Sequence, residues 1–439
     1  MGKNYQKNSM GKIMGKTISE KILAKHAKKE SVTAGEVVVC DVDFAMVTDT
    51  RASNTIKMMS KLEKNALKFT QNTALVLDHY SPPPHPEAAE IHQKMRQFSN
   101  EANTHLYDIG DGICHQVLPE GGHLTSGDLV VGTDTHSVTY GAFNAFGTGI
   151  EGSDVATVMA SGKLWFRVPE SVQIDLKGEL QPGVWAKDIT LHLLGKYKAE
   201  GLNYLAIEYV GSAVSKMAID DRMTLCNHAA ELGAKAAILE ADQKTIDWLT
   251  QHGAKPPQPV FADTDAIYKF KDQLNVSALA PQVARKHHVD DVVGTDEIDK
   301  QIIQFALIGT CTNGRLDDIR QAAHILKGKK LAKGVRMIVT PASRQIYLAA
   351  LREGLIEILT SAGASFEAAG CGTCVGITNH LVPGNRETVI STANRNFKGR
   401  LSNDEADIWL GSAATVAASA LTGFITDPRT VVGGTWRNS

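Results

Sequence analysis

The sequence predicts an α/β fold of two or three domains. Short apolar runs typical of buried strands alternate with stretches of helical periodicity along most of the chain, which is the pattern of a parallel sheet covered by helices. Polar residues directly follow several of these runs, where parallel sheets place their ligand sites. The length of 439 residues is enough for more than one such unit around a sizeable core.

The first elements are predicted from residue 17 onward. Residues 1–14 hold lysines but no acidic side chain, which favours a disordered extension. Ser19 followed by apolar residues at helical spacing predicts a capped amphipathic helix over 19–27, and the run 36–40 predicts a buried strand. Later apolar runs predict further strands at 75–77, 129–131, 172–176, 304–308 and 389–390.

Two changes of composition predict domain boundaries. An alternating strand begins after Pro169, and a proline-rich segment begins near Lys255 and ends near His288. The expected domains are 15–168, 169–287 and 288–439.

The composition excludes several classes of partner. Lys and Arg number 46 against 48 Asp and Glu, which gives a formal net charge of -2. So neutral a chain has no overall field for nucleic acid or an anionic membrane, and no apolar run approaches the roughly 18 residues that a membrane-spanning helix needs. The near-neutral charge therefore favours a small-molecule substrate. Six cysteines without a signal-peptide pattern indicate a reducing, cytoplasmic setting.

The sharpest motif is Cys371-Gly372-Thr373-Cys374, a C-x-x-C between two further glycines. Small neighbours allow the backbone to approach a bound metal and to donate hydrogen bonds to sulfur. Taken alone, the motif is also compatible with a zinc site, a redox-active dithiol or two buried small residues. The sequence offers no second C-x-x-C for zinc, and the motif lies late in the chain for a thioredoxin-like pair.

Cys311 adds a third thiol in a similar setting. It follows the predicted strand 304–308, between Gly309 and Gly314. Four thiolates close an iron-sulfur cluster for electron transfer, whereas three leave one iron of a 4Fe-4S cluster open to substrate. An open iron is a Lewis acid that lowers the barrier to loss of hydroxide.

Three histidine-containing segments are candidates for acid–base chemistry. They are Asp78-His79, His115 and Asp134-Thr135-His136. A carboxylate beside a histidine fixes its tautomer and raises its pKa, which suits a proton donor to a leaving oxygen. Each histidine taken alone is more often structural, and their common position after apolar strands favours the catalytic interpretation.

Asn394, Arg395 and Arg400 form a candidate anion site. Two arginines five residues apart around a glycine can face the same crevice, and guanidinium groups bind carboxylates through paired hydrogen bonds. An isolated segment of this kind is usually a solvated loop. This one gains weight because it closely follows the C-x-x-C motif.

Together these motifs resemble the aconitase superfamily, in particular the large subunits of 3-isopropylmalate dehydratases, homoaconitases and 2,3-dimethylmalate dehydratases. The resemblance extends from about residue 14 to 432. It is carried by segments that include VGTDTHSVTYGAFNAFGTGIEGSD, GTCTNGRLDDIRQAA, GCGTCVG and STANRNFKGRLS. It implies three α/β/α domains of the aconitase iron-sulfur type around a central cluster.

The resemblance also implies a role for each matching residue. The ligands of one 4Fe-4S cluster with a substrate-accessible fourth iron are Cys311, Cys371 and Cys374. The acid–base residues are Asp78 and His79 at the leaving hydroxyl, His115 with Asp134, and His136 with Glu208 as its carboxylate partner. The substrate-binding residues are Thr135, Asn394, Arg395 and Arg400.

The same resemblance implies an active site shared with a second protein. The catalytic base of this family is a serine in a smaller swivelling domain, and the chain ends at Ser439 without such a domain. We therefore expect a hydro-lyase large subunit that binds the cluster alone and needs a separate small subunit. Its expected substrate is a 2-hydroxy di- or tricarboxylic acid, in the first place 3-isopropylmalate of leucine biosynthesis.

Three positions depart from the family pattern. Thr135 stands where serine is usual, Thr373 replaces a proline inside the C-x-x-C, and Arg51 replaces a threonine. An extra cation at Arg51 can meet a substrate carboxylate, which leaves homoaconitase and dimethylmalate dehydratase as alternatives. A rival of another class, an RNA-binding regulator that has lost its cluster, is disfavoured by the near-neutral charge.

Overall fold

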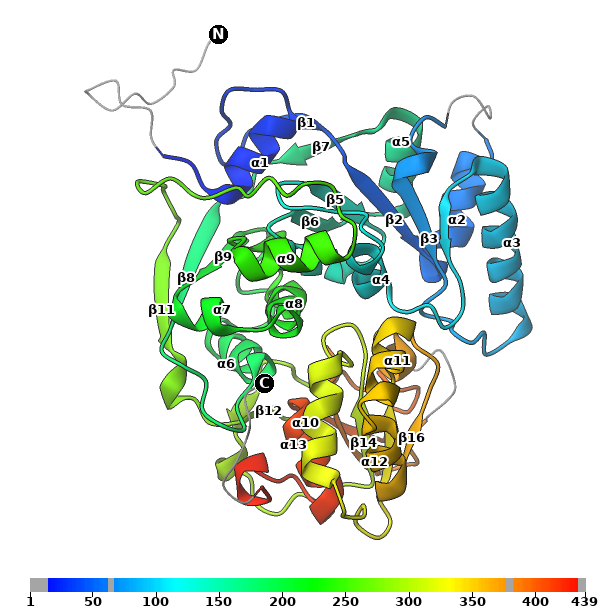
Figure 1. The fold of residues 1–439 in the computed structure, drawn as a ribbon, viewed down its shortest axis with the longest axis vertical. Helices are drawn as coiled ribbons and strands as arrows, with labels where there is room; N and C mark the ends of the chain where they lie inside the picture. The colour runs from blue at the N-terminus through cyan, green and yellow to red at the C-terminus, as the bar shows by residue number, and fades with distance from the viewer. Residues whose placement is uncertain (1–14, 62–66, 376–381, 433–439) are drawn as a thin grey trace.

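Three sheets flanked by helices, with one additional two-stranded ribbon, form a mixed α/β fold, as the sequence predicts (Figure 1). The structure is a computed structural model that describes residues 15–61, 67–375 and 382–432. The predicted extension 1–14 lies outside the described residues.

The first sheet has five parallel strands in the order β4-β3-β2-β5-β6. Its central strands are buried along their whole length because helices cover both faces, as their apolar sequences require. The strands are β2 (Phe44–Thr48), β3 (Thr73–Val76), β4 (His105–Tyr107), β5 (Leu129–Gly132) and β6 (Phe146–Gly149). The helices are α2 (Asp49–Met59), α3 (Pro86–Ala102), α4 (Cys114–Glu120), α5 (Gly152–Ser161) and the 3-10 helices η2 (Thr70–Asn72) and η3 (Thr135–Phe143).

The N-terminal segment contains the predicted helix, α1 (Ile18–His26), with a different cap. Thr17 rather than Ser19 caps it: the Thr17 hydroxyl accepts from the Glu20 amide, and the Glu20 carboxylate accepts from the Thr17 amide. The next predicted strand is β1 (Val37–Asp41), which pairs antiparallel with β7 (Lys163–Arg167). The expectation that this strand is buried is wrong for one face, since its residues alternate between exposed and buried.

The second sheet has four parallel strands in the order β10-β9-β8-β11. All of them fall within the expected second domain, 169–287. The strands are β8 (Ser171–Lys177), β9 (Ala206–Val210), β10 (Ala236–Leu239) and β11 (Lys271–Asn275). The helices are α6 (Ala186–Tyr197), α7 (Ser212–Lys216), α8 (Ile219–His228), α9 (Gln243–Gln251), η4 (Ala229–Leu232) and η5 (Val276–Ala278).

The third sheet has seven strands in the order β13-β12-β18-β17-β14-β15-β16. It is parallel from β18 to β16, and at the other edge β12 pairs antiparallel with both β18 and β13. Strand β12 precedes the expected boundary at 288. The strands are β12 (Gln282–Ala284), β13 (Val292–Gly294), β14 (Phe305–Ile308), β15 (Arg336–Val339), β16 (Ala364–Phe366), β17 (Thr388–Ser391) and β18 (Asp407–Leu410). The helices are α10 (Leu316–Leu326), α11 (Arg344–Arg352), α12 (Leu355–Ala362), α13 (Ala413–Thr422), η6 (Thr295–Glu297), η7 (Gly372–Val375) and η8 (Pro428–Thr430).

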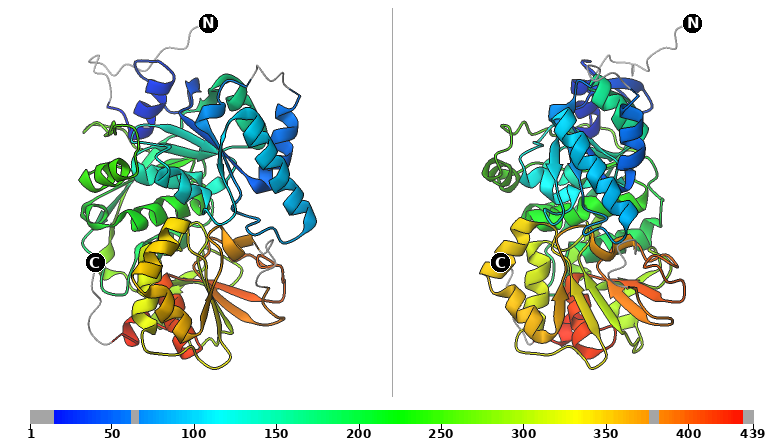
Figure 2. Two further views of the ribbon diagram at one scale, coloured as in Figure 1. Left: turned by 45° about the vertical axis from the view of Figure 1, so that its right-hand side comes forward. Right: turned by 90° about the vertical axis from the view of Figure 1, so that its right-hand side faces the viewer.

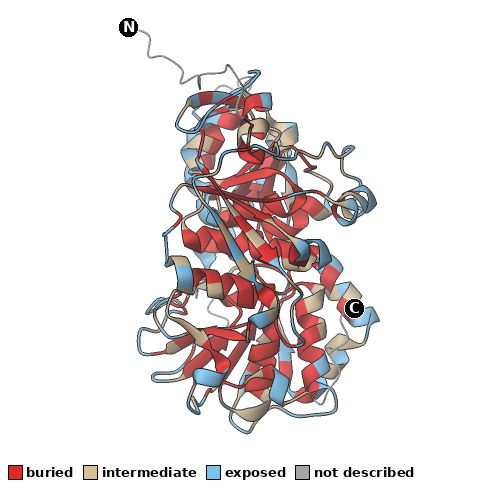
Figure 3. Ribbon diagram, turned by 90° about the vertical axis from the view of Figure 1, so that its left-hand side faces the viewer, coloured by how far each residue is buried: buried red, intermediate tan, exposed pale blue. Residues whose placement is uncertain are grey.

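The third sheet and its helices form the lower half of the molecule, beneath the first two sheets (Figures 1 and 2). The strands are mostly buried, and exposed residues concentrate in loops and on outer helix faces (Figure 3). None of the helices in the described part of the chain is long and apolar enough to cross a membrane.

Candidate active site

A cavity of about 340 Å³ lies where the carboxyl ends of strands from the upper and lower halves meet. Segments that follow β3, β5, β14 and β17 all contribute to its wall, as the sequence analysis predicts for parallel sheets. The lining residues are Thr50, Arg51, His79, Ile113, His115, Thr133, Asp134, Thr135, His136, Cys311, Cys371, Cys374, Arg395 and Arg400.

Asp78 holds His79 at the end of β3. The Asp78 Oδ1 lies 2.7 Å from His79 Nδ1, and its Oδ2 accepts from the Cys114 amide at 2.8 Å. The backbone of Asp78 also reaches the loop that carries Cys371, because its carbonyl accepts from the Cys371 amide at 2.8 Å. Burial alone would lower the pKa of His79, but the charges of Asp78 and Asp134 raise it well above its ordinary value.

Asp134 lies at the centre of three imidazoles. Its Oδ1 is 2.8 Å from His115 Nε2 and 3.3 Å from His136 Nδ1, and its Oδ2 is 3.4 Å from His79 Nε2. Burial opposes ionisation of Asp134, but hydrogen bonds from the three histidines hold its pKa well below the usual range. The carboxylate is therefore a fixed negative charge that positions the three rings.

The segment that carries Asp134 and His136 is locked by its own backbone. Asp134 caps η3 by accepting from the His136 amide at 2.8 Å. Farther along η3, Gly141 approaches β10 so closely that a Cβ would lie 1.5 Å from the Ala237 carbonyl oxygen. Glycine is thus required at 141 for η3 to pack against the second sheet and to aim His136 at the cavity.

The partner of His136 differs from the prediction. Glu208 lies on β9, where its carboxylate accepts from the Ile18 amide at 2.7 Å and from the Tyr268 hydroxyl, away from His136. Glu231 in η4 takes the predicted place, with Oε1 2.8 Å from His136 Nε2. Burial tends to raise the pKa of Glu231, but His136 and Arg395 lower it to about 2.

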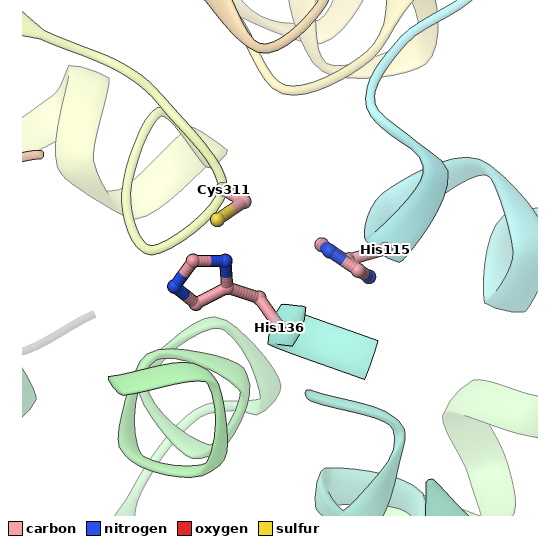
Figure 4. A group of neighbouring side chains, drawn as sticks. All are labelled: His115, His136 and Cys311. Carbon is pink, nitrogen blue, oxygen red and sulfur yellow. The ribbon is translucent and has the colours of Figure 1, made fainter. Parts of the chain in front are cut away.

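His136 and His115 differ in charge although both are buried. Burial lowers the pKa of His115 and Asp134 only partly opposes it. For His136 the same burial is outweighed by Cys311, Asp134 and Glu231, which raise its pKa well above the ordinary value. One ring nitrogen of His115, one of His136 and the sulfur of Cys311 lie within 4.8 Å of one another, and Figure 4 shows the two rings and the thiol converging from three segments of the chain.

The predicted substrate residues divide into two groups. Arg395, Arg400 and the exposed Thr135 line the cavity. Both carboxylate oxygens of Glu231 lie within 2.9 Å of Arg395 Nε, and Arg400 Nη2 lies 3.2 Å from the Cys374 sulfur. Asn394 is instead buried behind Cys311, where its Oδ1 lies 3.4 Å from the sulfur. The structure therefore places Asn394 against a cysteine and not on the cavity wall.

Cys311, Cys371 and Cys374 are buried and line the same cavity. A hydrogen bond from Cys371 and the Arg400 cation lower the pKa of Cys374 well below its ordinary value, which favours the thiolate. The hydrogen bond to Cys374, together with burial, raises the pKa of Cys371 well above its ordinary value, so Cys374 is the thiolate of this pair. Away from the cavity, burial raises the pKa of Cys40 to about 12 and that of Cys226 well above the ordinary range. Three thiols on one wall, one of them beside a cation, fit the ligand set of an iron-sulfur cluster.

Two buried basic side chains that the sequence analysis missed, Lys187 and Arg315, hold the Cys311 loop. Lys187 on α6 donates to the Thr312 hydroxyl at 3.1 Å and to the carbonyls of Thr392 and Ala393 at 3.0 and 2.9 Å. Arg315 donates to the Cys311 carbonyl at 3.0 Å. The sequence signal for Lys187 is its place on the buried stripe of α6, one and two turns before Leu191 and Leu194.

Asp49 is a third residue that the sequence analysis did not assign. Its carboxylate accepts from the His79 and Tyr80 amides at 3.2 and 2.8 Å, and His92 Nε2 lies 3.1 Å from its Oδ2. The His79 loop is therefore held from α2 and α3 as well as by Asp78.

Comparisons with known proteins agree with this site. The model of the aconitase family (aconitate hydratase) matches residues 20–302 and 294–423. The chain is 44% identical over 418 residues to 3-isopropylmalate dehydratase large subunit 1 of Methanopyrus kandleri, covering 95% of this chain and 99% of that protein. It is 44% identical over 395 residues to the probable methanogen homoaconitase large subunit of Methanosarcina mazei, covering 90% of this chain and 100% of that protein.

A bacterial relative gives the same picture. Over 420 residues the chain is 42% identical to 3-isopropylmalate dehydratase large subunit 1 of Thermotoga maritima, covering 95% of this chain and 99% of that protein. Since these matches span almost the whole chain and the family model covers both halves of the cavity, the chain belongs to the aconitase family of hydro-lyases, as its motifs predict.

Proposed function

We propose that this chain is the large subunit of a 4Fe-4S hydro-lyase that removes and adds water across neighbouring carbons of a 2-hydroxy di- or tricarboxylic acid. One observation carries the proposal. A single cavity collects three thiols, three histidines around one carboxylate, and three arginines. These are the groups needed to hold a cluster, move a proton and bind an anionic substrate.

In this proposal Cys311, Cys371 and Cys374 hold the cluster. When bound there, the cluster supplies an electrophilic iron that favours departure of the substrate hydroxyl. Arg315 and Lys187 keep the Cys311 loop in place through its backbone and the Thr312 hydroxyl.

His79 is the proposed proton donor to the leaving oxygen. Asp78 occupies its Nδ1, so Nε2 is the nitrogen that faces the cavity beside Asp134. The raised pKa of His79 keeps the ring protonated at neutral pH. His115, with its lowered pKa, is neutral and donates its Nε2 proton to Asp134.

Arg395 and Arg400 orient the carboxylates that the substrate presents to the lower half. Glu231 engages Arg395 through Nε, which leaves the outer guanidinium nitrogens for substrate. Arg400 uses one outer nitrogen on Cys374, and its buried Nε has no partner among the residues that the structure describes.

The catalytic base is proposed to come from a small subunit. Asp134 is the one carboxylate among the described lining residues, and its pKa, held well below the usual range by three histidines, makes it a poor base. The relatives are named large subunits, which implies a small-subunit partner. The six free cysteines support a reducing, cytoplasmic setting for the complex.

The relatives' names leave two kinds of substrate, 3-isopropylmalate and the substrate of a homoaconitase. The test is anaerobic purification of the chain with and without a co-expressed small subunit, followed by assay of both acids. We expect turnover only by the complex. Substantial turnover by the large subunit alone would show that the base lies within this chain.

Cluster binding is tested separately from turnover. Cys374→Ser should remove most of the iron, sulfide and visible absorbance of the reconstituted subunit, because a three-thiolate site loses a ligand. Cys226→Ser is the matched control, since Cys226 is buried in α8 and absent from the cavity wall. Unchanged iron content in Cys374→Ser would contradict the ligand assignment.

A further inference from the structure

Arg51 is the third arginine of the cavity, and it stands apart from the other two. It lies in the first turn of α2, in the upper half of the molecule, whereas Arg395 and Arg400 follow β17 in the lower half (Figure 1). Its side chain lines both the central cavity and a neighbouring cavity of about 390 Å³. A substrate bound by the lower arginines would therefore meet Arg51 at its opposite end.

Arg51 also differs from the other two arginines in its contacts. Arg395 is paired with Glu231, and Arg400 contacts Cys374. Within residues 15–61, 67–375 and 382–432 the guanidinium of Arg51 has no hydrogen bond and no ion pair, and only its carbonyl is engaged, by the Thr55 hydroxyl. The site thus contains a cation whose donors are still available to a ligand.

Within the central cavity the wall beside Arg51 is polar, whereas the neighbouring cavity also has apolar lining from Leu164, Trp165 and Phe166. Thr50, Thr133 and Thr135 line the cavity beside it, and the Thr48 hydroxyl lies 3.0 Å from that of Thr50 and 3.2 Å from that of Thr133. Among the described residues that line the central cavity, Ile113 is the one aliphatic side chain. An isopropyl arm at this wall would displace water from these polar groups and offer them no hydrogen bonds in return. Such a loss is unfavourable.

We propose that Arg51 binds a third carboxylate of the substrate, so that the enzyme acts on a tricarboxylic 2-hydroxy acid rather than on a dicarboxylic acid with an apolar arm. The inference rests on the proposed function and narrows its substrate class. A carboxylate at Arg51 would form paired, charge-assisted hydrogen bonds and would accept from the neighbouring threonine hydroxyls. Arg51 thereby selects substrates by charge at the end remote from Arg395 and Arg400.

The test compares homoisocitrate with 3-isopropylmalate as substrates of the complex of large and small subunits. Wild type should show the higher kcat/KM for homoisocitrate. Arg51→Thr should lower that kcat/KM by about 10- to 100-fold, mainly through KM, because the lost contact is a charge-assisted hydrogen-bonded pair made in the ground state as well. The same substitution should leave kcat/KM for 3-isopropylmalate within about threefold.

Two measurements exclude a general defect. Lys57→Thr removes an exposed cation from the same helix outside the cavity, and it should leave both substrates unaffected. Titration calorimetry should show that Arg51→Thr weakens homoisocitrate binding to the complex without changing its iron content. Equal losses for the two acids, or a wild-type preference for 3-isopropylmalate, would overturn the inference alone. Failure of the complex to bind or convert either acid would overturn the proposed function and this inference with it.

Discussion

Glu208 on β9 and Glu231 in η4 are two buried glutamates in the segment that forms the second sheet, and their surroundings favour different protonation states. Glu208 accepts from the Ile18 and Ser19 amides at the start of α1 and from the Tyr268 hydroxyl, and burial raises its pKa to about 7. Glu231 is as deeply buried, yet His136 and Arg395 lower its pKa to about 2.

The difference shows what makes a buried carboxylate useful at an active site. The amides at a helix N-terminus and a neutral hydroxyl offer partial charges, which do not compensate the loss of water around an ionised Glu208. Two full positive charges do compensate it at Glu231. A position on a strand beside the site is therefore a weaker guide to a catalytic carboxylate than a charged partner.

The largest expected effect is on activity. Glu231→Gln removes the charge that holds His136 and Arg395, and it should lower kcat/KM of the complex by about 100- to 1,000-fold, as for loss of a general acid–base component. Glu208→Gln keeps the hydrogen-bonding shape at the α1 contact and should change kcat/KM by less than about threefold. Comparable losses in the two variants would remove the functional distinction between these glutamates.

Stability sharpens the same comparison. Glu231→Ala leaves the buried charge of His136 and the half-buried charge of Arg395 without their partner, and it should lower the free energy of unfolding by about 3–5 kcal/mol. Glu208→Ala leaves neutral donors unsatisfied and should cost about 1–3 kcal/mol. Urea denaturation of the two variants beside wild type checks the order, and a larger loss for Glu208→Ala would reverse our interpretation.

The two glutamates should respond to pH with opposite signs. Glu208 has a folded pKa of about 7 against 4.5 for an ordinary glutamate, so its proton stabilises the fold below pH 4.5 and that contribution, about 3 kcal/mol, is lost as the pH rises to 7. Glu231 has a folded pKa of about 2, so its contribution is present above pH 4.5 and is lost as the pH falls toward 2.

Free energies of unfolding across pH, for wild type and each Gln variant, measure these contributions directly. From pH 4.5 to 7 wild type should lose stability relative to Glu208→Gln, because the glutamine does not titrate and only wild type loses the contribution of the bound proton. The difference between wild type and Glu231→Gln should shrink in the opposite direction, from pH 4.5 downward. If the difference in free energy of unfolding between wild type and Glu208→Gln is constant from pH 4.5 to 7, the α1 amides and Tyr268 are sufficient to stabilise the ionised Glu208.

The smallest effect is expected at Tyr268. Tyr268→Phe removes one hydrogen-bond donor from Glu208, and it should cost about 1 kcal/mol of stability without changing kcat/KM. Tyr204→Phe is a suitable control because the Tyr204 hydroxyl donates to the Arg167 carbonyl in an exposed position. A loss of activity in Tyr268→Phe larger than in Tyr204→Phe would connect Glu208 to the site.

Sequence periodicity and motifs predicted the strands and the cavity wall well, because both depend on local order along the chain. The apolar runs became β3, β5, β8, β14 and β17, and the polar residues after four of them meet at one cavity. The assignment of Glu208 as the partner of His136 depended on the family resemblance, and Glu231 was not considered. Which of two glutamates meets His136 depends on how η4 packs against η3, and no spacing along the chain records that contact.

The remaining misses have similar causes. The short strand β12 follows the second sheet in sequence but pairs with β18 in the third, so the sheets divide the chain slightly before residue 288. Thr17 rather than Ser19 begins α1 because Glu20 completes a reciprocal cap with Thr17. Asn394 adjoins the predicted arginines in sequence, yet it turns toward Cys311 because its side-chain nitrogen donates to Asn227 at 2.8 Å.

Lys187 connects a helix beside the second sheet to two loops of the third sheet. Its ammonium belongs to α6, but all three of its acceptors lie on loops that follow strands of the third sheet. A gene rearrangement that transferred the third domain to another protein would leave those acceptors without a donor and remove support from the Cys311 loop. We therefore expect a chimaera joined between these two parts of the chain to keep the Cys311 loop in place only when its parents together supply this lysine and its three oxygen acceptors.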